Sequence, residues 1–308
     1  MDEFELIRRY FLRPDEAAGV ITGIGDDGAV LQPDPGREII TVIDTLVEGV
    51  HFLPDTDASD IGYRAVAVNL SDIAAMGGRP RWMTLALTLG DANADWLGKF
   101  SAGLHAAAAE HGVALVGGDT TQGSCIVVSV QITGDIETGT ALQRSGANAG
   151  DTIYVTGTVG DAACGLDLIR EGRPDPYLSS RLLRPSARVK YGQSLLGTAT
   201  AAIDVSDGLF ADLQKLLSAS GLGGVIDLDR LPVSEALRSK CDNDVVRRYC
   251  LAGGDDYELC FTANIEPMPD LGDPGATDIG KVTTGDSLVC CDAGVVVAYD
   301  DSGYRHFK

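Results

Sequence analysis

The sequence predicts an α/β protein built from two domains, and three observations support this fold class. Segments with strand character alternate along the chain with segments whose apolar residues recur at helical spacing. The 308 residues exceed the usual size of a single hydrophobic core. A polar, glycine-containing stretch, Thr138–Asp151, interrupts the alternation near the middle of the chain. We therefore expect one domain at residues 1–139 and a second at residues 140–308, each α/β or α+β.

The first domain is expected to alternate strands with two amphipathic helices. One helix, Asp60–Met76, begins at a capping residue, either Ser59 or Asp60 itself. The other helix, Asp95–His111, ends before Gly112. The expected strands are apolar runs, at Glu38–Asp44, Arg81–Leu89, Val113–Val116 and Ser124–Ile132.

The second domain repeats this alternation. Its expected strands are Thr152–Thr156, Ala201–Val205, Tyr257–Thr262 and Val295–Tyr299. Its expected helices are Asp161–Glu171, Ser186–Leu196 and Leu209–Ser218. The segment Glu266–Thr277 carries three prolines and is expected to be an exposed loop. One run of basic residues has partly helical spacing and is expected to form a solvated face without a role: Arg181, Arg184, Arg188 and Lys190.

Composition and charge exclude several classes of protein. The formal net charge is −21, so the chain would repel a phosphate backbone, and general nucleic-acid binding is not expected. No stretch approaches the length of a membrane-spanning helix, and the first residues, MDEFELIRRYF, are acidic where a secretory signal would be basic. The seven cysteines are scattered without a CxxC pair, which argues against a disulfide framework or a zinc site. We expect a cytoplasmic protein.

Aspartates gather at glycine turns and at the ends of expected elements. At about 4 Å and an effective dielectric of about 20, two carboxylates repel by about 4 kcal/mol, so a fold that gathers several needs cations there. Oxygen-only surroundings suit magnesium, which completes its shell with water and substrate phosphates. Any one of these aspartates alone is typical of a turn or a helix cap, and only the joint pattern indicates magnesium and a polyphosphate. The segments are GDD at 25–27, IDT at 43–45, SD at 71–72, GGD at 117–119 and DVSDG at 204–208.

One familiar nucleotide motif is present in form only. Residues Gly23–Gly28 match GxGxxG, but a helix must follow that fingerprint, and Pro33 and Pro35 prevent one. The chain has no Walker A sequence, no protein-kinase motif set and no GxSxG elbow. If the chain binds ATP, it uses a less common scaffold.

Taken in order, the motifs resemble those of the thiamine-monophosphate kinase family. GIGDDGAV, NLSDIAAMGG, GGDTT, DVSDG and GGDDYEL follow in that family's order, and the resemblance covers nearly the whole chain. It implies a first domain whose mixed sheet forms a homodimer through its strands, and a ferredoxin-like second α/β domain. It also implies transfer of the terminal phosphate of ATP to thiamine monophosphate, assisted by several Mg²⁺ ions. The acceptor phosphate is already a nucleophile, so catalysis is mainly positioning and charge neutralisation, without a general base.

The same resemblance assigns roles to residues by position. The residues that match the family's magnesium ligands are Asp27, Asp44, Asp72, Asp119, Asp204 and Asp207. Those that match its nucleotide contacts are Gly118, Asp119, Arg144 and Ser206. Those that match its acceptor site are His51, Asp255 and Tyr304. In addition, Ser206–Gly208 precede an expected helix, whose N-terminus would offer free amide donors to a phosphate.

Three positions depart from the family pattern. Val42-Ile43 stand where the family has hydroxyl residues before Asp44. The family's arginine after GGDTT is Gln122 here, and the glutamate of its GGE is Asp255, one methylene shorter. These departures affect the expected number of metal ions and the expected binding of the acceptor more than the expected class of reaction.

Two alternatives remain open at this level. A related ATP-dependent synthetase, of the aminoimidazole-ribotide or selenophosphate type, uses similar aspartates with a different acceptor. Selenophosphate synthesis would favour a reactive cysteine near the N-terminus, whereas the first cysteine here is Cys125. A non-catalytic nucleotide or divalent-ion binder would hold metal and nucleotide but release no ADP.

Overall fold

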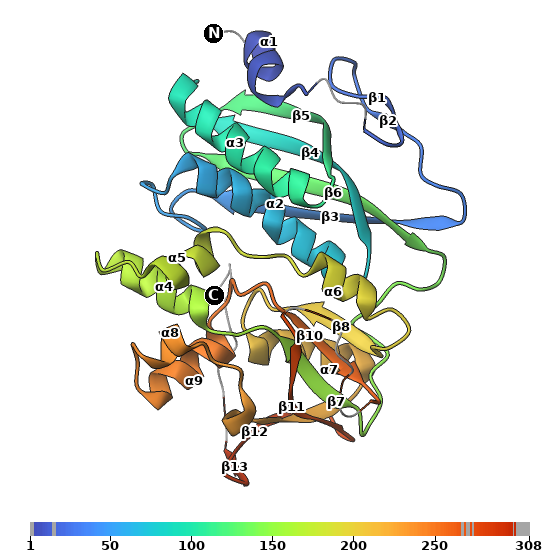
Figure 1. Cartoon of the computed structure of the whole chain (residues 1–308), viewed down its shortest axis with the longest axis vertical. Helices are drawn as coiled ribbons and strands as arrows, with labels where there is room; N and C mark the ends of the chain where they lie inside the picture. Colours follow the sequence, from blue (N-terminus) through green and yellow to red (C-terminus); the bar gives the residue numbers. More distant parts are fainter. Residues whose placement is uncertain are drawn as a thin grey trace. The chain divides into compact units, whose positions relative to one another are not determined.

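The computed structural model of the chain describes residues 3–13, 17–265, 268, 272, 274–297 and 299. By its internal contacts the chain divides into two compact units. Unit 1 comprises residues 1–73 and 78–139, and unit 2 comprises residues 74–77 and 140–308. Each unit combines helices with its own β-sheet, which confirms the predicted mixed α/β class (Figure 1). None of the described helices combines the length and apolar character needed to span a membrane.

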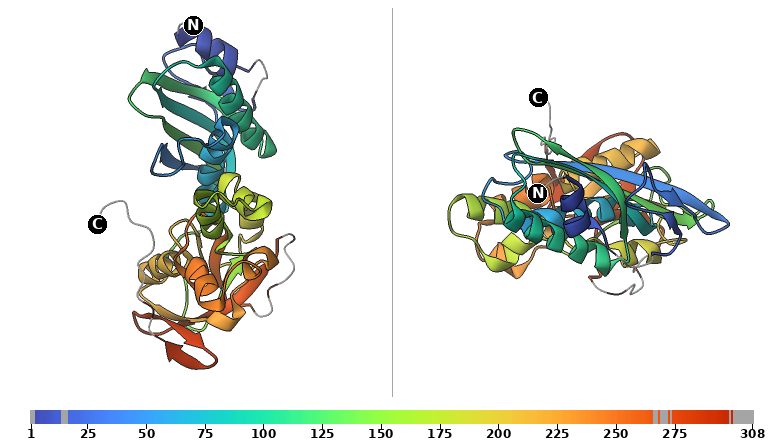
Figure 2. Two further views of the ribbon diagram at one scale, coloured as in Figure 1. Left: turned by 90° about the vertical axis from the view of Figure 1, so that its left-hand side faces the viewer. Right: turned by 90° about the horizontal axis from the view of Figure 1, so that it is seen from above.

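Unit 1 is built on a four-stranded mixed sheet. Its elements are α1 (Glu3–Leu6), the π-helix η1 (Ile7–Phe11), β1 (Val20–Thr22), β2 (Val30–Leu31), β3 (Arg37–Val47), α2 (Ala58–Ala75), β4 (Arg79–Leu89), α3 (Ala94–Glu110), β5 (Ala114–Gln122) and β6 (Val127–Glu137). The sheet order is β3-β6-β4-β5, in which β4 and β5 are parallel and the other neighbours antiparallel. Helices α2 and α3 lie on the same side of this sheet (Figure 1 and Figure 2).

Helices α2 and α3 approach each other closely at two glycines. A Cβ at Gly103 would lie 1.8 Å from the carbonyl oxygen of Ser59, and a Cβ at Gly62 would lie 2.2 Å from that of Phe100. Both neighbours are backbone atoms, which cannot move aside as the end of a flexible side chain can. The two helices therefore pack at a separation that only glycine permits at these positions.

Gly103→Ala is expected to destabilise the protein by about 1–3 kcal/mol or more, because the added methyl group meets the backbone of α2. Gly98 lies in the same helix, and a Cβ there would meet only the ring of Tyr10, at an ordinary contact distance of 3.8 Å. Gly98→Ala should therefore leave stability unchanged or raise it by up to about 1 kcal/mol, since alanine favours a helix over glycine. Urea unfolding of both variants measures the difference, and equal destabilisation by the two would contradict the close helix contact.

Unit 2 is built on a seven-stranded sheet. Its elements are β7 (Thr152–Thr156), α4 (Asp161–Arg170), α5 (Pro176–Leu183), α6 (Val189–Ser194), β8 (Ala201–Asp204), α7 (Leu209–Ser220), β9 (Gly223–Asp227), the 3₁₀ turn η2 (Leu228–Arg230), α8 (Glu235–Arg238), α9 (Asn243–Ala252), β10 (Leu259–Ala263), β11 (Ala276–Thr283), β12 (Leu288–Asp292) and β13 (Val295–Val297). The order is β13-β12-β9-β11-β7-β10-β8, and only β12 and β9 are parallel among these described strands. Helix α7 packs against β8, β9, β10 and β12, so its apolar side closes the core.

Several elements of unit 2 differ from the sequence-based expectation. The helix expected at Ser186–Leu196 is shorter, α6, and the helix α5 was not expected at all. Asp175 caps α5 by accepting hydrogen bonds from the amides of Tyr177 and Leu178, with Pro176 in the first turn. Strand β9 begins with two glycines because a Cβ at Gly223 would lie 2.5 Å from the Ser287 carbonyl oxygen. Half of the expected loop 266–277 lies outside the described residues, and β11 includes its last two positions.

Candidate functional site

Asp27 lies in the connection between β1 and β2. The residue is exposed, and its amide donates to Asp26 Oδ1 at 2.8 Å. The segment that leads into β1 is tied to the sheet, because the Ala18 carbonyl accepts from Arg81 Nη2 at 3.2 Å and from Trp82 Nε1 at 3.1 Å. The chain is therefore anchored to β4 just before β1, and Asp27 follows on the far side of that strand.

The other three predicted magnesium ligands of unit 1 lie inside regular elements. Asp44 is within β3, Asp72 within α2 and Asp119 within β5. The predictions that Asp44 ends a strand and that Asp119 lies at a glycine turn are therefore wrong, whereas Asp72 lies inside the helix predicted at Asp60–Met76. Strand β5 continues through its glycines because it passes close to β4: a Cβ at Gly118 would lie 2.0 Å from the carbonyl oxygen of Leu85. Gly118 thus has a packing requirement of its own, whatever else it contacts.

The strand register assigns opposite sheet faces to two of these aspartates. Asp44 is in line with Val130 across β3 and β6. Asp119 is in line with Ser129 through the β5, β4 and β6 pairings. Because Ser129 and Val130 are consecutive in β6, their side chains extend from opposite faces. Asp44 and Asp119 consequently point to different sides of the sheet.

The Asp44 side chain extends from the sheet face that α2 covers, and α2 carries Asp72. Gly134 lies four residues beyond Val130 in β6, on the same face, and a Cβ there would lie 3.3 Å from Ile73 Cδ1. Within the described residues, no group of three or more His, Cys, Asp or Glu side chains is arranged to hold a metal ion. Carboxylates in ones and twos still fit magnesium, which takes one or two of them and completes its shell with water and substrate phosphates.

In unit 2, Asp212 closes the turn that carries Ser206 and Asp207. Its Oδ2 accepts from the amides of Ser206, Asp207 and Gly208, at 2.9, 2.9 and 3.2 Å. Burial raises the pKa of the Asp212 carboxyl group. Asp212 therefore occupies the amides of Ser206, Asp207 and Gly208. The prediction that the N-terminus of the following helix, α7, offers free amides to a phosphate concerns the residues from Leu209 on and stays a prediction.

The two predicted magnesium ligands of unit 2 differ in their surroundings. Asp204 ends β8 and is buried. The Asp207 side chain is about one-third exposed, and its Oδ2 accepts from Lys215 Nζ at 2.5 Å. Lys215 also bonds Asp212 Oδ1 at 2.7 Å. One lysine thus bridges both carboxylates of the turn and offsets part of their repulsion.

Asp255 lies on a turn that packs against this same segment. Asp255 and Tyr257 have φ values of +67° and +51°, which non-glycine residues rarely adopt. The Asp255 amide donates to the Ser206 carbonyl at 2.9 Å, and the Tyr257 amide donates to that of Val205 at 2.9 Å. A Cβ at Gly254 would lie 2.3 Å from the Ser206 oxygen, so the two loops meet backbone to backbone. The structure thereby brings Asp255, predicted for the acceptor, next to Ser206, predicted for the nucleotide.

The remaining predicted contacts belong to different parts of the chain. In unit 1, His51 Nδ1 accepts from the Val47 amide at 2.9 Å, so a neutral ring carries its proton on Nε2. In unit 2, Arg144 is exposed, and its carbonyl accepts from Ser220 Oγ at 3.3 Å. Tyr304 lies outside the described residues.

Two of the departures from the family pattern have a visible structural context. Ile43 is 65% exposed on β3, where the family pattern has a hydroxyl residue. Gln122 Nε2 donates to the Gly90 carbonyl at 3.1 Å. Gln122 therefore ties the end of β5 to the end of β4 and supplies no positive charge there.

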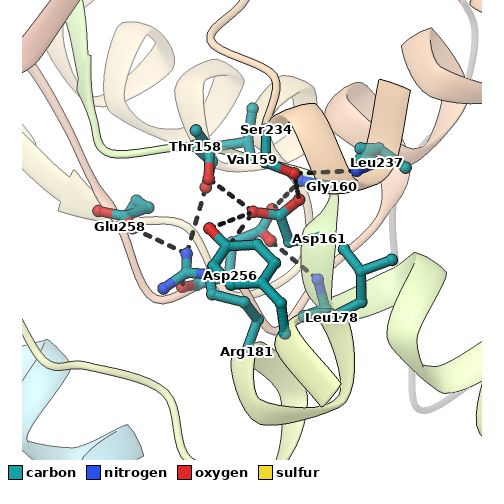
Figure 3. A network of polar contacts seen from close by, with 12 residues as sticks. Thr158, Val159, Gly160, Asp161, Leu178, Arg181, Ser234, Leu237, Asp256 and Glu258 are labelled. Atoms are coloured by element: carbon teal, nitrogen blue, oxygen red, sulfur yellow. Dashed lines mark hydrogen bonds and ion pairs between the residues drawn. The ribbon is translucent and has the colours of Figure 1, made fainter. Parts of the chain in front are cut away.

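Unit 2 also contains a buried cluster of charged side chains that sequence reasoning missed (Figure 3). Arg181 Nη2 donates to Glu258 Oε1 at 2.8 Å, and Arg181 Nε lies 3.7 Å from Asp161 Oδ2. Arg188 donates to both oxygens of Glu258, at 2.7 and 2.5 Å. The expectation of a solvated basic face is therefore wrong for Arg181 and Arg188, whereas the other two members of that run are exposed.

Asp256 joins this cluster to the start of α4. Its carboxylate accepts from the amides of Gly160 at 2.7 Å and Ala162 at 3.4 Å. Burial raises the pKa of Asp256 well above its ordinary value. Nearby, Asp161 accepts from Thr158 Oγ1 at 2.6 Å and from the hydroxyl of Ser234 at 2.5 Å. The segment that follows Asp255 is thus fixed to the interior of unit 2.

The chain is similar to known proteins along nearly its whole length. The models of the AIR synthase related protein match it twice, the N-terminal domain at residues 25–136 and the C-terminal domain at residues 148–290. Thiamine-monophosphate kinase of Salmonella typhimurium is 44% identical, over 99% of this chain and 98% of the relative. The crystal structure of thiamine-monophosphate kinase from Stenotrophomonas maltophilia is 42% identical, with a TM-score of 0.86 over 96% of this chain and 98% of that one. The structure of AaThiL complexed with AMPPCP and TMP is 34% identical, with a TM-score of 0.82 over 92% of each chain.

Proposed function

The chain belongs to the thiamine-monophosphate kinase family, and from this premise we infer that it transfers the terminal phosphate of ATP to thiamine monophosphate. The observation in this chain that supports the inference most is the contact between two loops of unit 2. The Asp255 amide donates to the Ser206 carbonyl at 2.9 Å, so the segment assigned to the acceptor lies against the segment assigned to the nucleotide. Phosphoryl transfer requires donor and acceptor to be held together, and this contact serves that requirement.

Phosphoryl transfer to this acceptor requires positioning of the substrates and neutralisation of their charge, and it requires no general base. A phosphate oxygen of the acceptor is already nucleophilic, so no side chain has to remove a proton. Both reactants are anionic, and bound magnesium would supply the neutralising charge. We propose that the ligands come from the aspartates assigned by resemblance: Asp27, Asp44, Asp72, Asp119, Asp204 and Asp207.

The remaining assignments divide between the two substrates. For the nucleotide we propose contacts from Gly118, Asp119, Arg144 and Ser206. Arg144 is exposed, so its guanidinium group is accessible to the phosphate oxygens of a nucleotide. For the acceptor we propose contacts from His51, Asp255 and Tyr304. The carboxylate of Asp255 would face the cationic thiazolium ring.

We propose further that the protein is a cytoplasmic homodimer formed through the sheet of unit 1. Ile39 and Ile43 are 49% and 65% exposed on β3. Both alternate with Ile40, which lies on the face covered by α2, so they extend from the opposite face. Exposed apolar side chains on an uncovered sheet face favour a protein partner. Sedimentation of the protein and of Ile43→Lys checks the proposal, since the substitution should shift a dimer toward monomer.

A panel of monophosphates with ATP and magnesium, followed by phosphorus NMR, tests the function. We expect thiamine diphosphate and ADP from thiamine monophosphate. Turnover of a different acceptor would favour a related synthetase. Binding of metal and nucleotide without any ADP would identify a non-catalytic binder.

Asp255→Ala is expected to raise the KM for thiamine monophosphate, with kcat changed less and the KM for ATP nearly unchanged. The side chain is proposed to bind the acceptor's cationic ring and takes no part in the chemical step. Steady-state kinetics with each substrate varied in turn separates these effects. A rise in the KM for ATP alone would remove Asp255 from the acceptor site.

A further inference from the structure

The carboxylate of Asp255 is oriented by a neighbour on its own turn. The Tyr257 hydroxyl donates to Asp255 Oδ1 at 3.0 Å. Both residues have positive φ values, a backbone conformation that persists only where the surroundings fix it. The Tyr257 hydroxyl therefore contacts the carboxylate predicted to bind the acceptor, on a stretch of backbone that the fold must hold in place.

The surroundings hold this turn through its backbone. The amides of Asp255 and Tyr257 donate to the carbonyls of Ser206 and Val205, both at 2.9 Å. In return, the Val205 amide donates to the Glu258 carbonyl at 2.8 Å. These three backbone hydrogen bonds hold the turn against the end of β8, where the segment assigned to the nucleotide begins.

The side chains between and after these two residues anchor the turn in the interior. Asp256 and Glu258 are fully buried. Asp256 accepts from the Gly160 amide at 2.7 Å, and Glu258 accepts from Arg181 Nη2 at 2.8 Å (Figure 3). With its backbone fixed on one side and its alternate side chains fixed on the other, the turn has little freedom to redirect the Asp255 carboxylate.

The Tyr257 ring is itself packed in place. Tyr257 is 8% exposed, so its hydroxyl has a direction set by packing. Asp255 is half-buried, and the hydrogen bond from Tyr257 restricts the rotamers that its carboxylate can adopt. A hydrogen bond to a charged group from a rigid donor selects one of these rotamers before the ligand arrives.

We propose that Tyr257 is a positioning residue of the acceptor site, whose hydroxyl holds the Asp255 carboxylate toward the cationic ring of thiamine monophosphate. This inference rests on the proposed function of Asp255. It also gives a physical account of the shorter side chain: an aspartate on a rigid, strained turn with an orienting tyrosine needs no additional methylene to find its direction.

Tyr257→Phe removes the hydroxyl and keeps the ring. We expect the KM for thiamine monophosphate to rise about 10-fold, in line with the loss of a hydrogen bond to a charged group. The KM for ATP should stay within about 2-fold, and kcat should change less than the acceptor KM. The matched control is Tyr249→Phe, also in unit 2, whose hydroxyl donates to Asp167 Oδ2 at 2.8 Å and which has no assigned role in binding. The control should leave both KM values unchanged.

A double-mutant cycle with Asp255→Ala completes the test. If Tyr257 acts only through Asp255, the double variant should have the acceptor KM of Asp255→Ala alone. Multiplicative effects, an unchanged acceptor KM in Tyr257→Phe, or an equal rise in both KM values would overturn the inference while leaving an active parent enzyme as evidence for the function. A parent that does not phosphorylate thiamine monophosphate would overturn both. Thermal unfolding of each variant separates loss of fold from loss of binding.

Discussion

Replacing Asp72 by asparagine is expected to lower kcat by at least about 100-fold, which corresponds to about 2.7 kcal/mol of transition-state stabilisation. Asp44→Asn should have an effect of the same order. Asparagine keeps the shape of aspartate but not its charge, so each change weakens the magnesium site that would neutralise the transferred phosphate. Steady-state kinetics at saturating ATP, acceptor and magnesium measures the loss.

Although both substitutions should lower kcat, neither should lower the stability of the folded protein. In metal-free buffer their melting temperatures should be unchanged or higher, because one carboxylate fewer reduces like-charge repulsion. Asp95→Asn is the matched control: it makes the same chemical change in unit 1, at a side chain that is 83% exposed on α3 and 3.5 Å from Lys99. We expect the control to keep kcat within about 2-fold. Near-normal turnover in both Asp44→Asn and Asp72→Asn would mean that these aspartates have structural roles only.

Elements with a strong local pattern could be predicted from the sequence. The strand at Thr152–Thr156 has the predicted bounds, because all of its residues are buried and the run has no polar alternation to shift its ends. Helix α3 lies within one residue of prediction at both ends, since the apolar spacing is regular and Gly112 stops it. Where pattern and terminators agree, local sequence decides the element.

Glycine misled the prediction where it serves close packing rather than a turn. Gly117-Gly118 were expected to end a strand, yet β5 runs through them because only glycine fits beside the Leu85 carbonyl. The Gly223 pair at the start of β9, where no strand was predicted from the sequence, likewise serves close packing. A sequence displays the residue but not the neighbouring strand that requires it, so the two uses of glycine look alike.

The candidate site could be predicted only as a set of residue types and roles. The resemblance supplied the roles, and the pairing of Asp255 with Ser206 came from the fold. Sequence reasoning did not foresee that Asp212 accepts hydrogen bonds from the amides of Ser206, Asp207 and Gly208. The aspartate four residues after Gly208 was a visible signal, since a carboxylate in the first turn of a helix commonly accepts such amides.

The buried cluster around Glu258 could not be predicted from the sequence, for a different reason. Arg181 and Arg188 are 77 and 70 residues away from Glu258 in the chain. Charge alone suggests exposure, and a buried ion pair is recognisable only when both partners are placed. A basic run at helical spacing therefore gave the wrong prediction for two of its four members.

Glu258→Gln is expected to destabilise the protein by about 3–5 kcal/mol, the cost of removing one partner from a buried ion pair. The Glu258 side chain is fully buried, and the side chains of Arg181 and Arg188 are only 10% and 16% exposed. Glutamine fills the same volume but leaves both guanidinium groups without their shared carboxylate. Urea unfolding of the full chain, followed by circular dichroism, measures the change.

Two comparisons show why burial should decide the size of this effect. Glu171 pairs with Arg173, and these side chains are 53% and 69% exposed, so Glu171→Gln should cost no more than about 1 kcal/mol. Arg188→Gln should fall between the two, because it leaves Glu258 still paired with Arg181 at 2.8 Å. Equal, small losses in all three variants would mean that water reaches the cluster and screens it. The expected order, largest for Glu258 and smallest for Glu171, follows from one buried carboxylate that pairs with two largely buried arginines.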